Sequence, residues 1–409
     1  MAAMKVLVDA LVLVSVASTL AFAPRVLVRC PGSARATGRA LSPLVFLALV
    51  TGVVYVNQVL FTVYVMRVHG GDPSFIAQYL PAGWFDLASA DHMVQRLAEG
   101  FPVPTLLAPS VLRVQAFLEL PFVLLAFATV VRWFDSDLYR RITRSFLLPL
   151  ASVSYTAVFC LVEWDLRNPY TVDDLVVRAV SAVFTPLFIR RLAARDTGTC
   201  RTPASVPGLL VFIGSLGALG VLVLVVYDTA LLYNLGRLDR RLPLALAAAG
   251  ALLVLRRVAA RLSEPSTPGL TLSFVRHALQ YWLALFFVPA LAVRYGVVFG
   301  TPQLAAGAGL LTAATACVLA ARDSSAEDRG GRGALGAGRR RPFVLLLAGR
   351  LGCTVLAGAC AAAAAAWLTP KAYYEVTLLS GAAAFLVTAV VVCGLVDAWA
   401  DARAQGASG

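Results

Sequence analysis

The chain has little charge. Only 14% of its 409 residues are Asp, Glu, Lys or Arg, whereas a typical soluble domain has about 25%. Hydrophobic residues make up 59% of the sequence, and the mean hydropathy is +0.80. A chain with so few charged residues cannot supply the polar surface of a water-soluble globular protein. A chain with so many apolar residues does not stay disordered. The composition therefore excludes a soluble enzyme and a disordered protein, and it predicts a polytopic membrane protein that resides in the lipid bilayer.

Residues that bind redox cofactors and metals are scarce or scattered. The chain has 3 histidines, His69, His92 and His277, whereas two b-type haems in a helix bundle usually need about four axial ligands. The 7 cysteines form no C-x-x-C pair and no zinc or iron–sulfur spacing. The sequence also lacks a Walker A motif, a G-x-G-x-x-G loop and a G-x-S-x-G elbow. It therefore predicts no haem, iron–sulfur or nucleotide cofactor.

Long apolar runs, in contrast, are abundant. A helix that crosses a membrane needs about 20 apolar residues, and the chain contains about eleven such runs. Their approximate bounds are 5–24, 42–66, 109–132, 146–163, 175–190, 207–235, 242–256, 270–298, 302–321, 343–367 and 374–397. The sequence thus predicts an all-α, polytopic bundle of about eleven transmembrane helices.

The net charge of +13 is explained by the positive-inside bias of membrane proteins, and nucleic-acid binding is not needed to account for it. If the N-terminus lies outside, the cytoplasmic loops carry about twice as many basic residues as the outer loops, among which Arg178 is counted. We therefore expect a protein of the cell membrane with an outer N-terminus and a cytoplasmic C-terminus. One predicted outer loop is an exception to this bias, because it carries three arginines: Arg237, Arg240 and Arg241.

Residues 1–23 have two interpretations. Lys5, the apolar stretch after it and the small residues Ala21 and Ala23 are typical of a cleavable signal peptide. Asp9 interrupts that stretch, however, and the alternation of basic loops requires a first transmembrane helix. The alternation favours an uncleaved helix, and the signal peptide stays open as the alternative.

Composition divides the chain into four parts. We expect a main membrane bundle over 1–321, a basic Gly- and Arg-rich cytoplasmic linker over 322–341, a C-terminal helix pair over 342–398 and a flexible tail over 399–409. The outer loop 67–108 has about 40 residues, which is longer than an ordinary connection. Its segment 85–97 has apolar residues on one helical face and polar residues on the other. This pattern predicts either an interfacial helix on the outer membrane surface or a short helix packed on the bundle.

A first group of candidate site residues lies inside the predicted spans. Asn57 and Gln58 are near the middle of the second span, Glu119 is near the middle of the third, and Arg350 lies in the tenth. Polar groups at such depth cost several kcal/mol unless they are paired or hydrated, so they mark candidate substrate-binding residues. A buried Glu119–Arg350 ion pair is a natural hypothesis. The alternative is that these groups only make structural hydrogen bonds between helices.

A second group of candidates is acidic and faces the outside. Glu163 and Asp165 precede the loop between the fourth and fifth spans, Asp173 and Asp174 follow it, and Asp228 lies near the outer end of the sixth span. Carboxylates can act as general acids or bases, and the adjacent Asp173 and Asp174 are candidate ligands for Mg²⁺ or Mn²⁺. The alternative is that all five are solvated loop acids.

Three functions fit these patterns. The first is a membrane enzyme or binding protein for a lipophilic substrate, isoprenoid or lipid-linked, with the acidic group as its catalytic site in the outer half of the bundle. The second is a secondary transporter or exporter with a midplane site at Glu119, Arg350, Asn57 and Gln58. The third is a non-catalytic membrane assembly protein, in which helix faces rich in small residues bind partners.

Overall fold

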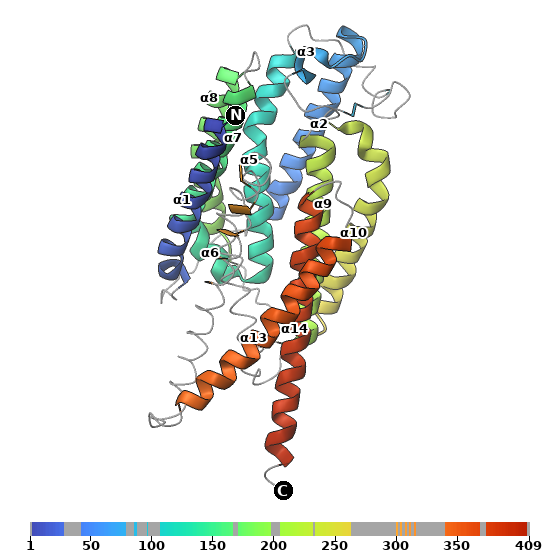
Figure 1. The fold of residues 1–409 in the computed structure, drawn as a ribbon. Helices are drawn as coiled ribbons and strands as arrows, with labels where there is room; N and C mark the ends of the chain where they lie inside the picture. The colour runs from blue at the N-terminus through green and yellow to red at the C-terminus, as the bar shows by residue number, and fades with distance from the viewer. Residues whose placement is uncertain are drawn as a thin grey trace. The chain divides into compact units, whose positions relative to one another are not determined.

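The computed structural model describes most of the chain. The described residues are 2–27, 42–78, 86–87, 96, 107–166, 171–197, 205–231, 234–262, 340–368 and 374–406, together with scattered positions between 300 and 315. In this part of the chain the structure contains helices and no strands, which confirms the all-α prediction (Figure 1).

The helices follow the apolar runs of the sequence. They are α1 (Ala2–Leu27), α2 (Pro43–Val68), α3 (Ser74–Ala77), α5 (Leu107–Phe134), α6 (Ser136–Arg144), α7 (Leu147–Leu166), α8 (Thr171–Ala194), α9 (Val206–Val226), the π-helix η1 (Tyr227–Leu231), the 3₁₀-helix η2 (Leu235–Arg237), α10 (Leu238–Ala259), α13 (Arg340–Leu368) and α14 (Tyr374–Gly406). α14 thus continues into the stretch 399–409, which the sequence analysis assigned to a flexible tail.

Five stretches of these helices are long and apolar enough to cross a membrane: Lys5–Phe22, Pro43–Val68, Leu112–Phe134, Val206–Leu231 and Leu235–Ala259. A sixth is added if the bent pair formed by α6 and Leu147–Leu161 of α7 counts as one span. These apolar helices indicate a membrane-embedded protein. The total of about eleven spans stays a prediction, because 270–298 and most of 302–321 lie outside the described residues.

α8 occupies the predicted span 175–190 but is not among those five, because it contains several charged residues. Their arrangement explains how such a helix can lie in a bilayer. One face exposes an apolar stripe, which consists of Val172, Val176, Val180, Val183 and Leu187. The charged residues Asp174 and Arg178 lie on the buried face, against the protein. The middle of α8 therefore exposes an apolar face, while its buried charges point toward the protein.

Contacts divide the chain into two compact units. The first unit comprises 1–200, 221–248 and 284–311, and the second comprises 201–220, 249–283 and 312–409. In the first unit, α5 packs against α2, α6, α7 and α8, while α1 packs on α7 (Figure 1). In the second unit, α13 packs along α14. Because residues 316–339 lie outside the described part, the domain boundaries at 321 and 341 stay predictions.

Two glycines end α2 where the predicted outer loop begins. Gly70 and Gly71 adopt positive φ angles of 60° and 88°, which favour glycine and end the helix. Asp72 then accepts hydrogen bonds from the backbone N–H and the hydroxyl of Ser74 at 2.9 and 2.8 Å. These bonds lower the pKa of Asp72. The interfacial helix predicted over 85–97 lies outside the described residues, except for positions 86, 87 and 96.

Candidate functional site

A buried, charged site of the first unit centres on Arg178, in the second turn of α8. Only 8% of this residue is exposed. Its Nη1 donates to Oε2 of Glu119 on α5 at 2.9 Å, and its Nη2 donates to Oε1 of Glu163 on α7 at 3.3 Å. One guanidinium therefore joins three helices by two ion pairs. We call Arg178, Glu119 and Glu163 the arginine cluster.

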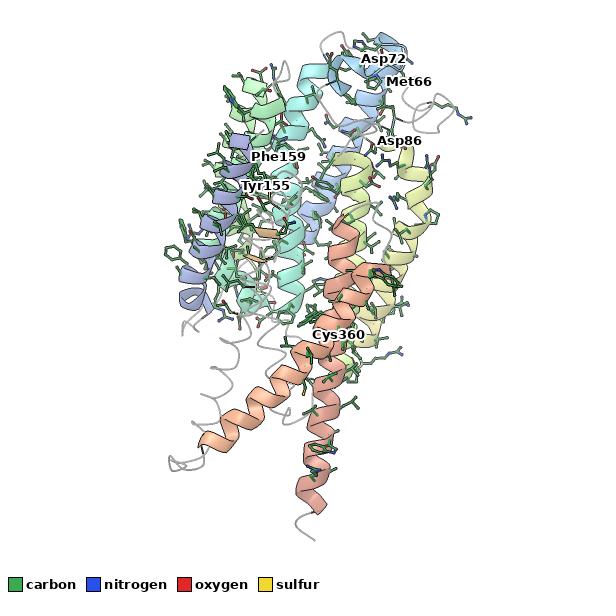
Figure 2. The ribbon with its side chains drawn as sticks, in the orientation of Figure 1. Met66, Asp72, Asp86, Tyr155, Phe159 and Cys360 are labelled. Atoms are coloured by element: carbon green, nitrogen blue, oxygen red, sulfur yellow. The ribbon has the colours of Figure 1, made fainter. Side chains whose placement is uncertain are left out.

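Two aromatic residues of α7 complete the surroundings of Arg178. The hydroxyl of Tyr155 donates a short hydrogen bond to Oε1 of Glu119. The guanidinium carbon of Arg178 lies 3.6 Å from the ring centroid of Phe159, which is a cation–π contact. Tyr155 and Phe159 are labelled near each other in Figure 2. Nε of Arg178 is buried and has no hydrogen-bond partner in the described part of the chain. The cluster thus orders three charged side chains at a high desolvation cost.

Asp174 lies one helical turn before Arg178. It is only 7% exposed, and its buried Oδ1 has no hydrogen-bond partner among the residues that the structure describes. Asp174 precedes the predicted span 175–190, in the first turn of α8. Burial, and then the negative charge of Glu163, raise the pKa of Asp174 to about 7. A carboxyl group with this pKa exchanges a proton near neutral pH.

The neighbouring Asp173 has a different environment. Its side chain is half-exposed and pairs with Arg113 of α5 through a short contact. The direct ion-pair partner of Arg113 is therefore Asp173. Adjacent carboxylates in the sequence thus have different partners, because successive residues of a helix point in different directions.

Neutral polar groups form a second cluster between α2, α5 and η1. Oε1 of Gln115 accepts hydrogen bonds from Nδ2 of Asn57 at 3.3 Å and from Nε2 of Gln58 at 3.4 Å. Nε2 of Gln115 donates to the carbonyl oxygens of Ala230 and Leu231 at 3.3 and 3.1 Å. This amide cluster holds the π-helix η1 against α5. Gln115 lies one turn before Glu119, so the two clusters meet at the same stretch of α5.

Asp228 of η1 belongs to a separate group of ion pairs. It accepts from Arg237 Nη1 and Arg241 Nε, each at 3.0 Å. Asp86 of the outer loop pairs with Arg237 at 3.3 Å and with Arg240 at 3.7 Å. These pairs give a reason for the three arginines that did not fit the predicted orientation: each pairs with an acid. They also occupy Asp228 with two cations, which is poorly suited to binding a metal.

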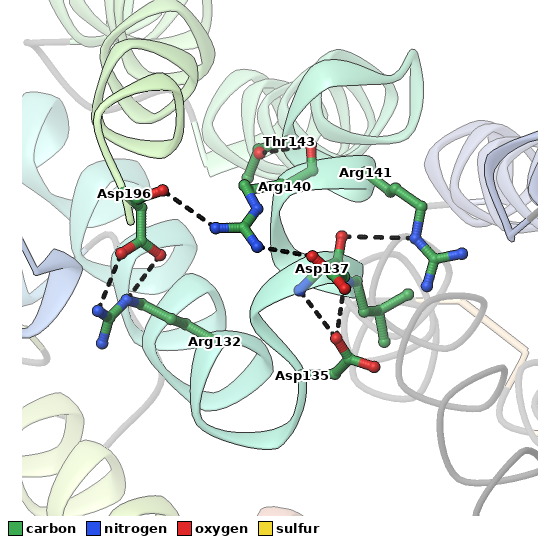
Figure 3. Close-up of polar contacts among 8 residues, drawn as sticks. Arg132, Asp135, Asp137, Arg140, Arg141, Thr143 and Asp196 are labelled. Carbon is green, nitrogen blue, oxygen red and sulfur yellow. Dashed lines mark hydrogen bonds and ion pairs between the residues drawn. The ribbon is translucent and has the colours of Figure 1, made fainter. Parts of the chain in front are cut away.

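A third polar network joins the opposite end of α5 to α6 and to the end of α8 (Figure 3). Arg132 donates to both carboxylate oxygens of Asp196 at 2.8 and 2.9 Å. Arg140 donates to the backbone oxygen of Asp196 at 3.1 Å and pairs with Asp137 at 2.6 Å. Asp135 caps α6 by accepting from two of its backbone N–H groups. These interactions fix the ends of the helices.

The structure brings together only some of the predicted site residues. Glu119, from the first group, and Glu163, from the second, meet at Arg178, with Asp174 one turn away. Asn57 and Gln58 contact Gln115 instead. The side chains of Asp165 in α7 and Arg350 in α13 lie outside the described part of the chain. The Glu119–Arg350 ion pair therefore stays a prediction, although the counter-ion found for Glu119 is Arg178.

Arg178 is the residue that sequence reasoning missed, because it was counted with the outer loops. Its location was recoverable from two signals. It lies within the predicted span 175–190, and it follows Asp174 by four residues, which places both on one helical face.

No metal centre emerges from the described residues. Among them, no group of three or more His, Cys, Asp or Glu side chains could hold a metal ion. The Mg²⁺ or Mn²⁺ site at Asp173 and Asp174 stays a prediction. Comparison of the chain with protein-family models, with curated proteins and with solved structures gives no match.

Proposed function

We propose that the chain is a multi-pass protein of the cell membrane that transports a solute by coupling it to protons. The N-terminus would lie outside and the C-terminus in the cytoplasm. The observation that carries this proposal is Asp174, a buried carboxyl group with an unpartnered oxygen beside the arginine cluster. Ionisable groups buried in a membrane bundle are costly, and they commonly mark ion pathways and proton relays.

The geometry suggests how the coupling would work. Asp174 gains or loses one negative charge near neutral pH, one helical turn from Arg178. Arg178 is shared between Glu119 on α5 and Glu163 on α7. A change of charge at Asp174 alters the balance of these two ion pairs, and hence the contact of α8 with α5 and α7. A solute that competes for either pair would thereby be linked to proton binding.

The amide cluster supplies a second set of contacts. Asn57, Gln58 and Gln115 offer neutral donors and acceptors on the α2 side of α5. Within the described ranges, Oε1 of Gln58 is buried without a hydrogen-bond partner. A polar solute could be held by such groups without a net charge.

A pH jump across the membrane tests the proposal without knowledge of the solute. The protein is reconstituted in vesicles that are adsorbed on a solid-supported membrane, and the transient current is recorded after a rapid pH change. We expect a charge displacement that titrates near pH 7 and is lost in Asp174→Asn. Asp173→Asn is the matched control and should keep the current. Wild-type vesicles that give no more current than protein-free vesicles would exclude the proposal.

Asp174 also favours a second candidate, the membrane enzyme for a lipophilic, isoprenoid or lipid-linked substrate. A carboxyl group with a pKa of about 7 is suited to general acid–base catalysis. Glu163, Asp165, Asp173 and Asp228 would assist as catalytic groups, and Asp173 and Asp174 are the ones that would bind a metal. Comparison of host lipids tests this: if Asp174→Ala and Asp228→Ala leave every lipid product unchanged, the enzyme is excluded.

A further inference from the structure

The exposed apolar face of α8 turns basic at its C-terminal end. The stripe from Val172 to Leu187 is followed on the same side of the helix by Arg190 and Arg191, and one turn later by Arg195. All three arginines are exposed. Residues four and seven positions apart share a helical face, so Arg191 continues the line of Leu187 and Arg190 that of Val183. Such a change from valine to arginine is expected where a helix leaves hydrocarbon and enters the headgroup layer.

The end of α6 brings a fourth arginine to the same place. Nη2 of Arg190 donates to the carbonyl oxygen of Arg144 at 2.6 Å, so the last turn of α6 contacts α8. Arg144 is itself exposed. α6 meets α7 at an angle of 66°. At this bend Phe146 is 55% exposed, with its ring centroid 5.3 Å from that of Phe22 on α1. Exposed aromatic rings beside arginines are typical of a membrane interface.

These four arginines differ from their neighbours because no carboxylate of the described residues pairs with them. Arg132 and Arg140, close by, are paired with Asp196 and Asp137. Within the described residues, Arg144, Arg190, Arg191 and Arg195 form no ion pair. Asp135, Asp137 and Asp196 are thus engaged by the network of Figure 3, and the four guanidinium groups can contact an external anion.

We infer that Arg144, Arg190, Arg191 and Arg195 bind the phosphate of an anionic phospholipid headgroup. Guanidinium groups bind phosphate oxygens in a bidentate manner, which suits them to this ligand. A lipid is favoured over a free phosphate or a nucleic acid because the basic site is continuous with the apolar stripe of α8. A phospholipid can place its acyl chains along the valines and its phosphate at the arginines, whereas a soluble anion uses only half of this surface.

Lipid exchange into nanodiscs tests the inference with the full chain. Binding of phosphatidylglycerol and of phosphatidylcholine is measured by native mass spectrometry of the purified protein. Each arginine near an anionic headgroup should strengthen binding by about fivefold. Arg191→Gln/Arg195→Gln should therefore weaken phosphatidylglycerol binding about 25-fold, with little effect on phosphatidylcholine. Neither side chain bonds to another residue in the described part of the chain, so this variant should fold normally.

The matched control is Arg256→Gln/Arg257→Gln, an exposed basic pair at the end of α10, which should keep wild-type binding. An equal loss in both double variants would overturn the inference, because it would indicate general charge attraction. Equal binding of both lipids by the wild type would also overturn it. Displacement of the lipid by millimolar inorganic phosphate alone would show that the site takes a soluble anion instead.

Discussion

Removal of the Arg178 guanidinium tests the arginine cluster most severely. The two N···O distances of 2.9 and 3.3 Å correspond to attractions of about 5 kcal/mol each at an effective dielectric constant near 20. Much of this attraction is offset by the desolvation of three charged groups. Arg178→Met keeps a similar shape but leaves Glu119 and Glu163 buried without this cation. Breaking a buried ion pair in this way costs about 3–5 kcal/mol of the free energy of unfolding.

The loss is measured by equilibrium unfolding in mixed detergent and SDS micelles. Arg113→Met is the control, because its partner Asp173 also joins α5 and α8 but this pair is half-exposed. The control should lose far less stability than Arg178→Met. Adding Glu119→Gln to Arg178→Met should restore part of the lost stability, because one uncompensated charge is removed. If Arg178→Met is no less stable than Arg113→Met, the reasoning about the cluster is refuted.

Three other predictions concern separate parts of the chain. The pKa of Asp174 is raised from 3.8 to about 7, so the folded protein holds this proton more tightly than the unfolded chain does. The free energy of unfolding should therefore fall as the pH rises from about 4 to about 7. Asp174→Asn should flatten the dependence of the melting temperature on pH, and an unchanged slope would contradict the assignment. Asp135→Ala removes the cap of α6, whose bonds are 2.8 and 3.0 Å, and should cost about 1 kcal/mol in SDS unfolding. In Gly358→Ala the new Cβ would lie 2.7 Å from the Phe385 ring, which should lower the free energy of unfolding by about 1–3 kcal/mol. In the control Gly352→Ala the new Cβ meets nothing within 4 Å, so this variant should not destabilise α13.

The positions of the helices could be predicted from the sequence because long apolar runs have few other stable forms in lipid. α8 shows the limit of that method. Its charges lower the mean hydropathy, yet they lie on the buried face or near the helix ends, and only the rotation of the helix in the bundle separates them from lipid. The partners of those charges could not be predicted. Glu119, Glu163 and Arg178 come from three helices, and their pairing depends on helix rotation and depth, which periodicity does not give.

The π-helix η1 was also beyond prediction. Its carbonyl oxygens are held by Gln115, a residue more than a hundred positions earlier in the chain. Likewise, the arginines after η1 were counted as a misplaced basic loop, because loop counting does not detect ion pairs such as Asp228–Arg237 and Asp228–Arg241. In each case the missing information is a contact between distant segments and not a local propensity.

Infrared difference spectroscopy of the carboxyl groups tests the central claim most directly. The purified protein is titrated between pH 4 and pH 9, and the C=O stretching band of protonated carboxyl groups is followed in the wild type, Asp174→Asn and Asp173→Asn. The account predicts a band that disappears as the pH rises through about 7, that persists in Asp173→Asn and that is absent from Asp174→Asn. A band that titrates near pH 4, or one that survives unchanged in Asp174→Asn, would contradict the assignment of Asp174 as the proton-binding group.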